Sequence, residues 1–329
     1  MPGAEPAGAP PGIPGGAPDG AQYDVVVAGG GLAGLTAALF AARHGWSTLV
    51  LESTVPGGQL INLQKIEDFP GFPTGVPGYD LGPMVQEQAE AEGAQFAVAE
   101  VLALEHLSQQ ASLAWRVVTS EGTYRAPALI VASGSRPRPL GVPGEEHLTG
   151  RGVSHCATCD GPLFKGRPVG VAGGGDAALH EALTLAGYAS RVVVMHPEPE
   201  FPAQAAYRRR VSDQEAIEAR HGVEVLEVLG DGALAGVRLR DVAGGAESRL
   251  DLAALFVYAG MEPNTHFLRD VIPLAPDGRI PTDGALRAAL AGLFAAGDVR
   301  QDASGYAITA AGDGATAAVS AHRYLSALR

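Results

Sequence analysis

The chain has 329 residues, of which 46% are hydrophobic, 6% aromatic and 45 are glycines. A chain of this length buries a large core and suggests two domains, and the composition fits an α/β protein rich in tight turns. The formal net charge of −13 argues against nucleic acid or an anionic membrane surface as a partner, and no apolar run approaches the roughly 18 residues of a membrane span.

The first residues, 1–22, are almost all Pro, Gly and Ala. They have neither the basic start nor the apolar stretch of a secretory signal, so we predict a disordered tail over this range. With no such signal and only two cysteines in the chain, the cytoplasm is the expected compartment.

A strand, a glycine-rich loop and a helix follow the tail. Residues 23–28 form a short β-branched run, which is typical of a buried parallel strand. They lead into the GxGxxG loop 29–34 and an Ala/Leu-rich helix that we expect to end near Arg43. A second strand is predicted over 48–51 and ends in Glu52.

Each of these parts has a physical task in dinucleotide binding. Gly29 makes the tight turn, Gly31 lets the backbone approach a pyrophosphate, and Gly34 lets helix and strand pack closely. The helix N-terminus offers free N–H donors to the phosphates, and Glu52 can hold a ribose hydroxyl. The complete pattern favours a dinucleotide-binding unit over a structural glycine turn.

The two cysteines stand together in the run Cys156-Ala157-Thr158-Cys159-Asp160. A CxxC can be a redox disulfide, half of a zinc site or an accident of composition. A structural zinc ion normally takes four protein ligands, and because no second CxxC or Cys/His pair is present, we favour a redox role and expect no metal. Asp160 follows the second sulfur and can exchange a proton with a thiolate.

The strand–glycine–helix pattern repeats after the cysteines. Residues 167–172 precede a GxGxxA loop at 173–178, with a helix expected to about Ala186 and a strand over 191–195. The repeat predicts a second Rossmann-like unit. Its candidate nucleotide ligands are Gly173, Gly175, Asp176, Ala177 and Glu198.

A third signal lies near the end of the chain. A short strand over 293–296 ends on Gly297-Asp298, and an Ala-rich helix is expected from about Ala307 to Leu325. Asp298 can hold a ribityl hydroxyl, and the helix N-terminus can stabilise negative charge on a reduced flavin. The alternative is a strand–turn–helix with a capping acid.

Together these residues closely resemble the low-molecular-weight, bacterial-type thioredoxin reductases, from residue 23 to the end of the chain. The most specific match is the run 156–160 followed by Gly161. Further matching segments are residues 56–60, 69–72, 132–134, 142–146, 263–265 and 297–299.

The resemblance implies a homodimer and an α/β fold of two Rossmann-like dinucleotide-binding domains. Residues 23–139 and 259–329 would form the FAD-binding domain. Residues 140–258 would form an inserted NAD(P)H-type domain that carries the CxxC. The crossings would be the loops 135–140 and 260–263, rich in Pro or Gly as linkers should be.

The resemblance also implies the FAD ligands and the roles of the redox residues. Cys159 would face the flavin and form the charge-transfer thiolate, Cys156 would attack the substrate disulfide, and Asp160 would protonate the departing thiolate. The implied FAD ligands are Gly29, Gly31, Leu32, Ala33, Gly34, Glu52, Gly58, Gln59, Leu60, Asp68, Val101, Ala132, Gly134, Gly297, Asp298, Tyr306, Ala307 and Ile308.

The chain departs from this family where the family grips the 2′-phosphate of NADPH. The family has His-Arg-Arg and a further Arg four residues on. Those positions here read His196, Pro197, Glu198 and Pro202. An acid there repels a phosphate but can accept a hydrogen bond from the free hydroxyl of NADH. The run 208–210 holds three arginines, but it falls on the next predicted helix and is more simply a solvated face.

The flavin half also departs from the family pattern. The family's Tyr-Arg-Gln reads Ser304-Gly305-Tyr306 here, which leaves Tyr306 free to lie against the ring. Met261 stands where the family usually has His, and Asp68 stands where it has Asn. We therefore expect a competent but retuned flavin site.

The leading hypothesis is an FAD-dependent thiol–disulfide oxidoreductase that acts on a thioredoxin-like or small disulfide substrate. Three electron sources stay open, namely NADPH, NADH, or neither. In the third case an electron-carrier protein reduces the flavin, or the protein runs in reverse as a dithiol oxidase. Dithiol-oxidase relatives tend to carry His after the second Cys, where this chain has Asp160. A non-enzymatic flavin redox sensor is the alternative from another class.

Overall fold

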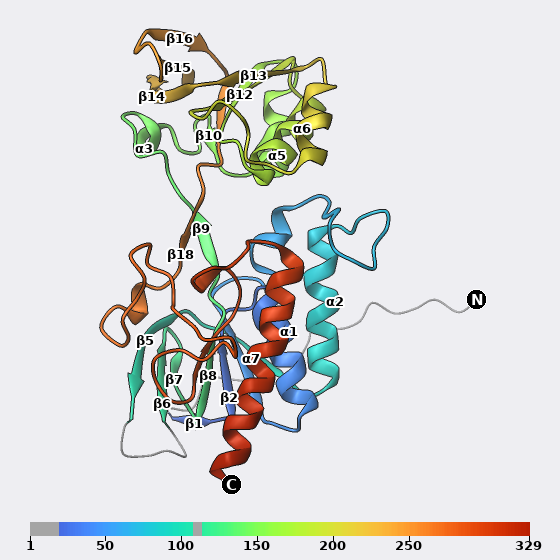
Figure 1. Ribbon diagram of the computed structural model, residues 1–329, viewed down its shortest axis with the longest axis vertical. Helices are drawn as coiled ribbons and strands as arrows, with labels where there is room; N and C mark the ends of the chain where they lie inside the picture. The colour runs from blue at the N-terminus through green and yellow to red at the C-terminus, as the bar shows by residue number, and fades with distance from the viewer. Residues whose placement is uncertain (1–19, 108–113) are drawn as a thin grey trace, which may run out of the picture. The chain divides into compact units, whose positions relative to one another are not determined.

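The computed structural model describes residues 20–107 and 114–329. The chain divides into two compact units (Figure 1). Unit 1 comprises the residues up to Ser135 together with Pro263–Arg329, and unit 2 comprises Arg136–Glu262. The domain boundaries implied by the family resemblance lie at 139–140 and 258–259. No helix in the described part of the chain is long and apolar enough to cross a membrane.

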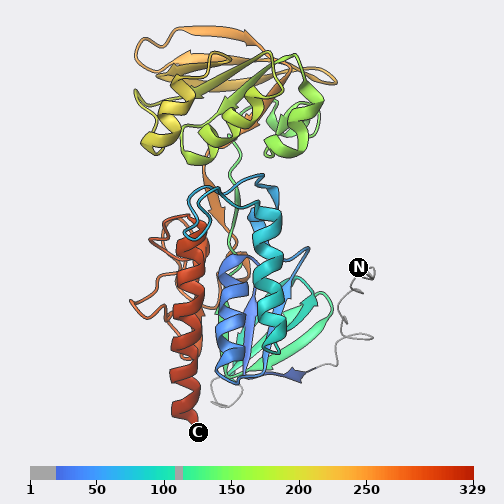
Figure 2. The same ribbon diagram turned by 90° about the vertical axis from the view of Figure 1, so that its right-hand side faces the viewer.

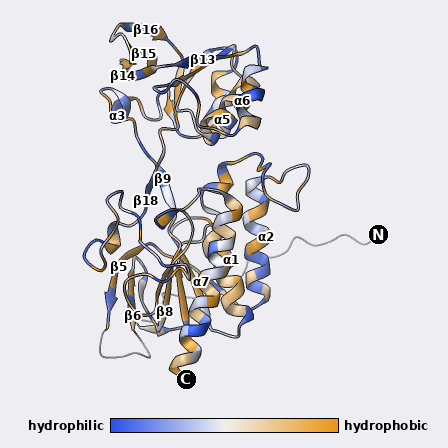
Figure 3. Cartoon of the chain, in the orientation of Figure 1, coloured by the Kyte–Doolittle hydropathy of each residue, from blue (hydrophilic) through white to orange (hydrophobic). Residues whose placement is uncertain are grey.

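Unit 1 is built on a five-stranded parallel sheet in the order β19-β8-β2-β3-β4. Its strands are β2 (Val25–Ala28), β3 (Thr48–Glu52), β4 (Gln95–Val98), β8 (Ala128–Val131) and β19 (Leu293–Ala295). Strands β2, β8 and β19 are buried throughout, and β8 is predominantly hydrophobic in Figure 3. Burial on both faces explains why they read as continuous apolar runs.

Three helices cover this sheet, namely α1 (Leu32–Arg43), α2 (Gly78–Ala91) and α7 (Ala307–Leu328). They lie side by side, with α1 in contact with both others (Figure 2). A Cβ atom at Gly314 would lie 2.1 Å from the Ala33 carbonyl oxygen, so only glycine permits this approach of α7 to α1. Short 3₁₀ turns in unit 1 are η1 (Gly58–Asn62), η4 (His266–Leu268) and η5 (Gly297–Val299).

A second sheet of unit 1 has four strands in the order β1-β7-β6-β5. They are β1 (Ala21–Gln22), β5 (Val101–His106), β6 (Trp115–Thr119) and β7 (Gly122–Ala126). The tail predicted over 1–22 lies outside the described residues up to residue 19. For residues 20–22 the prediction of disorder is wrong. The Gly20 N–H donates to the Thr123 carbonyl at 3.0 Å, and β1 pairs with β7.

The two predicted crossing loops form strands instead. β9 (Ser135–Pro137) and β18 (Met261–Pro263) pair in a two-stranded sheet. The Arg138 N–H extends this pairing to the Gly260 carbonyl at 2.9 Å. Pairing with each other satisfies backbone groups that separate loops would leave to water.

Unit 2 has a five-stranded parallel sheet in the order β10-β17-β11-β12-β13 and an antiparallel sheet in the order β14-β15-β16. The parallel strands are β10 (Val153–Ser154), β11 (Pro168–Ala172), β12 (Arg191–His196), β13 (Ile217–His221) and β17 (Ala254–Val257). The antiparallel strands are β14 (Val223–Gly230), β15 (Leu234–Asp241) and β16 (Glu247–Asp251).

The helices of unit 2 include the one that follows the second glycine-rich loop. They are α3 (Glu145–Leu148), α4 (Ala157–Asp160), α5 (Asp176–Ala186) and α6 (Ala205–Ser212), with the 3₁₀ turn η3 (Gly161–Phe164). The succession β11, α5, β12 repeats the succession β2, α1, β3 of unit 1. The prediction of two Rossmann-like α/β units is confirmed.

Candidate active site

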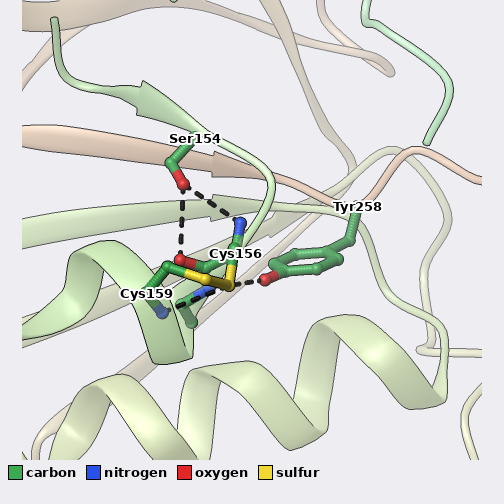
Figure 4. The surroundings of a disulfide bond; sticks show 5 residues. Ser154, Cys156, Cys159 and Tyr258 are labelled. Carbon is green, nitrogen blue, oxygen red and sulfur yellow. Dashed lines mark hydrogen bonds between the residues drawn. A yellow bond between two sulfur atoms is a disulfide. The ribbon is translucent and has the colours of Figure 1, made fainter. Parts of the chain in front are cut away.

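Cys156 and Cys159 form a disulfide at the start of α4, as predicted, with an S–S distance of 2.12 Å. Ser154 fixes the first cysteine, because its hydroxyl oxygen accepts the Cys156 N–H at 3.0 Å (Figure 4). The Cys159 N–H donates to the Cys156 sulfur at 3.1 Å. Cys159 is exposed and Cys156 half-buried, so the disulfide is within reach of a partner.

Two side chains join the CxxC segment to the end of β17. The Tyr258 oxygen accepts the Ala157 N–H at 3.1 Å, and His155 Nδ1 lies 3.1 Å from the Val257 carbonyl oxygen. A carbonyl only accepts, so His155 Nδ1 is the donor. Burial, followed by the negative charges of Glu181 and Asp160, raises the pKa of Tyr258, so the phenol keeps its proton.

Asp160 is brought beside the disulfide by the single turn of α4. Its N–H donates to the Cys156 carbonyl at 3.1 Å, and its side chain is half-buried. A carboxyl group at this place can exchange protons with sulfur. Over residues 20–107 and 114–329, no group of three or more His, Cys, Asp or Glu side chains could hold a metal.

The glycine-rich loop of unit 1 has the shape that a bound dinucleotide needs. A Cβ at Gly29 would lie 2.3 Å from the Ala132 carbonyl oxygen, and one at Gly34 would lie 1.9 Å from the Gly29 carbonyl oxygen. At Gly31 the nearest atom is the Gly58 Cα at 4.0 Å, so this side of the backbone is open. Helix α1 begins without a side-chain cap, which leaves its first N–H groups for phosphate.

Glu52 at the end of β3 meets this loop. Its Oε2 accepts the Gly30 N–H at 2.7 Å, and its Oε1 accepts the Thr54 N–H at 3.1 Å. Sequence reasoning gave Gly30 no task, although a Cβ there would lie only 3.0 Å from the Glu52 Cβ. The middle glycine thus lets the acid approach the loop.

A chain of contacts links the remaining parts of the unit 1 cradle. A Cβ at Gly58 would lie 3.0 Å from the Gly31 Cα. Gln59 Nε2 donates to the Ser135 carbonyl at 3.3 Å, and the Ser135 hydroxyl donates to Asp298 Oδ2 at 3.2 Å. Burial raises the pKa of Asp298, while the Ser135 hydrogen bond opposes this shift. Ser135 was not predicted.

Predicted FAD ligands on other elements of unit 1 differ in their surroundings. At the start of α7, Tyr306 and Ile308 are 37% and 40% exposed, so both can reach a ligand. Ala307 packs against the small apolar cluster around Leu32 and Leu60. The carbonyl of Gly134 accepts the Asn264 N–H at 3.0 Å.

Two predicted ligands lie apart from this network of contacts. Asp68 is exposed. Val101, at the start of β5, packs against a buried hydrophobic cluster that includes Leu104 and Trp115. The surroundings of these two residues give no independent support for a contact with FAD.

The loop of unit 2 repeats this geometry. A Cβ at Gly173 would lie 2.3 Å from the Tyr258 carbonyl oxygen, whereas one at Gly175 would meet nothing within 4 Å. Asp176 is engaged by the chain, because its carboxylate accepts the Gln204 backbone N–H at 2.6 Å and the Gln204 side-chain amide at 2.9 Å. Ala177 is exposed.

The residue that meets the middle glycine of unit 2 is His196. A Cβ at Gly174 would lie 2.7 Å from His196 Cγ and 2.9 Å from Phe201 Cδ1. His196 Nε2 is buried without a hydrogen-bond partner, and burial lowers the pKa of its imidazole. Glu198, predicted as the ribose acid, is exposed further along the loop. His196 therefore takes the place that Glu52 has in unit 1.

Two of the three arginines after this loop have contacts within unit 2. Arg208 Nη1 lies 3.4 Å from a Glu200 carboxylate oxygen, and the Arg210 guanidinium lies 5.8 Å from the centre of the Tyr207 ring. All three arginines of the run 208–210 are exposed on α6, as predicted.

Comparison with known proteins gives a consistent answer. A family model described as pyridine nucleotide-disulphide oxidoreductase matches residues 23–314. The thioredoxin reductase of Treponema pallidum is 38% identical over 308 residues, covering 94% of this chain and 99% of the relative. That of Streptomyces coelicolor is 41% identical over 308 residues, covering 93% and 94%.

The fold points the same way. The crystal structure of Lactococcus lactis thioredoxin reductase superposes with a TM-score of 0.90 at 35% identity, covering 93% of this chain and 99% of that one. These relatives do not favour a carrier-fed reductase, a dithiol oxidase or a redox sensor. The chain therefore belongs to the pyridine nucleotide-disulphide oxidoreductase family, among the low-molecular-weight thioredoxin reductases, and is an FAD-dependent disulfide oxidoreductase.

Proposed function

We propose that this enzyme passes electrons from FAD in unit 1 through the Cys156–Cys159 disulfide to a thioredoxin-like protein. The observation that carries the proposal is the disulfide at the start of α4, whose backbone is held by Ser154 and Tyr258. The relatives named as thioredoxin reductases support a thioredoxin-like substrate. A small disulfide compound is the alternative substrate.

Cys156 is the proposed nucleophile toward the substrate. Its sulfur accepts the Cys159 N–H, and a hydrogen bond to the charged form of a thiol favours the thiolate. The reduced Cys156 attacks one substrate sulfur and forms a mixed disulfide, and the departing substrate thiolate takes a proton from Asp160. The Cys159 thiolate then attacks Cys156, which releases the second substrate sulfur and restores the intramolecular disulfide.

FAD is proposed to lie along the glycine loop of unit 1. Its pyrophosphate would meet the open backbone at Gly31 and the uncapped start of α1, while Glu52 and Asp298 would hold ribose and ribityl hydroxyls. Bound FAD supplies the electron pair that opens the disulfide. The other predicted ligands just after β8, on η1 and at the start of α7 would complete the FAD site.

The nicotinamide site of unit 2 is proposed to work poorly with NADPH. The loop after β12 offers exposed Pro197, Glu198 and Pro202 where the family has arginines. Two of the arginines on α6, Arg208 and Arg210, lie against Glu200 and Tyr207 respectively. NADH, which has no 2′-phosphate, is the better fit, and an electron-carrier protein is the alternative donor.

The thioredoxin-like partner is proposed to dock beside the disulfide on Leu163 of η3. This side chain is 73% exposed shortly after Cys159 in the chain. A large exposed apolar side chain next to a reactive group is a natural contact for a protein substrate.

A second copy of this chain is the other proposed partner. The large exposed apolar side chains on α1, η1 and α2 of unit 1, with one on the loop before η1, would be covered in a homodimer. They are Phe40, Val55, Ile61, Tyr79 and Met84. We also propose a cytoplasmic location, because a lone redox-active CxxC is typical of reducing compartments.

Thioredoxin reduction by the photoreduced enzyme tests this function independently of the donor. With the flavin photoreduced under anaerobic conditions, the enzyme should reduce a thioredoxin disulfide stoichiometrically. Leu163→Glu should raise the KM for thioredoxin about tenfold, which is about 1.4 kcal/mol, without slowing a small disulfide. Failure of the reduced enzyme to reduce any disulfide would contradict the proposal.

A further inference from the structure

Asp313 on α7 is an acid that the FAD site described above does not use. Its Oδ2 accepts the N–H of Gly297, the residue just before Asp298, at 3.1 Å. The same oxygen accepts a hydrogen bond from Arg300 Nε at 2.5 Å, and Oδ1 accepts one from Arg300 Nη2 at 3.1 Å. The Arg300 and Asp313 side chains are only 18% and 14% exposed. A largely buried ion pair thus joins α7 to the η5 turn.

The guanidinium of Arg300 is fully engaged within the chain. Its Nε and Nη2 donate to Asp313, and its Nη1 donates to the Gln301 carbonyl at 3.1 Å. Two parallel hydrogen bonds from a guanidinium fix the orientation of a carboxylate as well as its charge. Arg300 therefore orients Asp313 toward the Gly297 N–H.

The place of Asp313 is fixed by the contact of α7 with α1. Gly314, the next residue, approaches the Ala33 carbonyl so closely that a Cβ there would lie 2.1 Å from its oxygen. Gly297 has a φ of +76°, and a Cβ there would lie 2.9 Å from the Ala33 Cβ. Helix α7 and the η5 turn thus meet the start of α1 at the same residue, and Asp313 links them to each other.

Three contacts hold Asp298 within this turn. Asp313 holds the backbone on its N-terminal side through the Gly297 N–H. Arg279 Nε donates to the Asp298 carbonyl at 3.3 Å, and the Ser135 hydroxyl donates to its Oδ2 at 3.2 Å. A carboxylate that is already oriented needs less ordering when a ligand binds, which favours affinity.

We propose that Asp313, oriented by Arg300, fixes the η5 turn so that Asp298 can hold the ribityl chain, and thereby raises the affinity of unit 1 for FAD. Asp313 acts through Asp298 and is a positioning residue. The inference rests on the proposed FAD site of unit 1.

The sign of the effect separates positioning from simple charge. The pyrophosphate of FAD is anionic, so the negative charge of Asp313 taken alone would oppose binding. Removing that charge should tighten FAD binding if only the charge matters. It should weaken FAD binding if Asp313 positions Asp298.

The test is the dissociation constant of FAD, measured from the flavin fluorescence that appears when the holoenzyme is diluted. Asp313→Ala should raise this constant about tenfold, because the Gly297 N–H loses its acceptor. Asp313→Asn keeps an amide oxygen for this N–H and should raise it less than about threefold. In an Asp298→Ala background, Asp313→Ala should change it less than about twofold, because the positioned residue is gone.

Asp283→Ala is the matched control within unit 1. Asp283 also pairs with an arginine, Arg287, and accepts the N–H groups of Ala285 and Arg287, but its side chain is 50% exposed. This variant should leave the affinity for FAD unchanged.

Wild-type affinity or tighter binding in Asp313→Ala would overturn the inference, as would an undiminished effect in the Asp298→Ala background. If Asp313→Ala does not fold, Arg300→Met combined with Asp313→Leu removes both charges, which a buried site tolerates better than one unpaired charge. Unchanged affinity in that double variant has the same consequence. Wild-type affinity in Asp298→Ala alone would instead contradict the FAD site on which the inference rests.

Discussion

The two glycine-rich loops of this enzyme share a backbone plan and differ in the side chain that meets the middle glycine. In unit 1, Glu52 accepts the Gly30 N–H at 2.7 Å. In unit 2, a Cβ at Gly174 would lie 2.7 Å from His196 Cγ. The first loop therefore presents an acid that can hold ribose hydroxyls, and the second presents an imidazole kept neutral by burial.

This difference shows that the residues that fix the loop backbone are not the residues that select the bound dinucleotide. Close backbone contacts require glycine at Gly29 and Gly34 in unit 1 and at Gly173 in unit 2, whatever dinucleotide is bound. Selection depends on the few side chains after the second strand, and in unit 2 these residues, at 197–202, include two glutamates and no arginine. This contrast supports the proposal that unit 1 binds FAD while unit 2 recognises the 2′-phosphate of NADPH poorly.

The largest expected effect concerns the redox cysteines, which unit 2 contributes in addition to its glycine-rich loop. Cys156→Ser and Cys159→Ser should each abolish disulfide turnover, since the dithiol needs both sulfurs, while FAD stays bound in unit 1. Cys159→Ser should also remove any long-wavelength thiolate–flavin band, whereas Cys156→Ser should keep it. Steady-state assays and visible spectra give the answer, and wild-type turnover in both variants would rule out this mechanism.

Asp160→Asn should slow thiol–disulfide exchange about 10²–10⁴-fold, because a positioned acid that protonates a departing sulfur gives help of this size. Flavin reduction should slow much less. Stopped-flow traces separate the two steps. An unchanged exchange rate across the pH range would leave Asp160 a structural role only.

Paired glycine substitutions compare the two loops directly. Gly31→Ala should weaken FAD binding by about 1–3 kcal/mol, because the added methyl group fills the open approach to the pyrophosphate. Gly175→Ala, where a Cβ meets nothing within 4 Å, should leave FAD binding unchanged. Flavin retained after dialysis is the measurement. Equal FAD loss in both variants would break the assignment of FAD to unit 1.

The smallest effect concerns pH. Burial lowers the pKa of His196 below its ordinary 6.5, so the neutral imidazole stabilises the fold above that pH. This stability is lost as the pH falls through the lowered pKa. The melting temperature should therefore drop less between pH 7 and pH 5 in His196→Gln than in the wild type, by about 1–2 °C. Substituting the exposed His147 by Gln serves as the control, and an identical drop in all three proteins would contradict this account.

Much of the fold was predictable because its signals are local. The glycine loops and apolar runs located α1, β3, α5 and β12 closely. The strands β1, β9 and β18 were missed, since two or three residues carry no periodic pattern and pair only through distant backbone. The disulfide itself was predicted from the CxxC.

The supporting contacts of the site were not predictable from local pattern. The Ser135–Asp298 hydrogen bond spans 163 residues and the Tyr258–Ala157 bond spans 101. Likewise, His196 is as far along the chain from Gly173 as Glu52 is from Gly29. Only the structure shows that the His196 ring lies against Gly174 of the loop. Such contacts depend on the order of the strands in each sheet, which brings distant segments of the chain together.

Anaerobic titration of the flavin with NADPH and NADH tests the central claim most directly. Each lost charge-assisted hydrogen bond to a phosphate costs on the order of 1.5–3 kcal/mol, so two or three losses weaken NADPH binding at least about a hundredfold. Micromolar NADPH should therefore bleach the flavin slowly, NADH should be less impaired, and Pro197→Arg, Glu198→Arg and Pro202→Arg together should restore part of the NADPH response. Fast bleaching of the unmodified enzyme by micromolar NADPH would contradict the account.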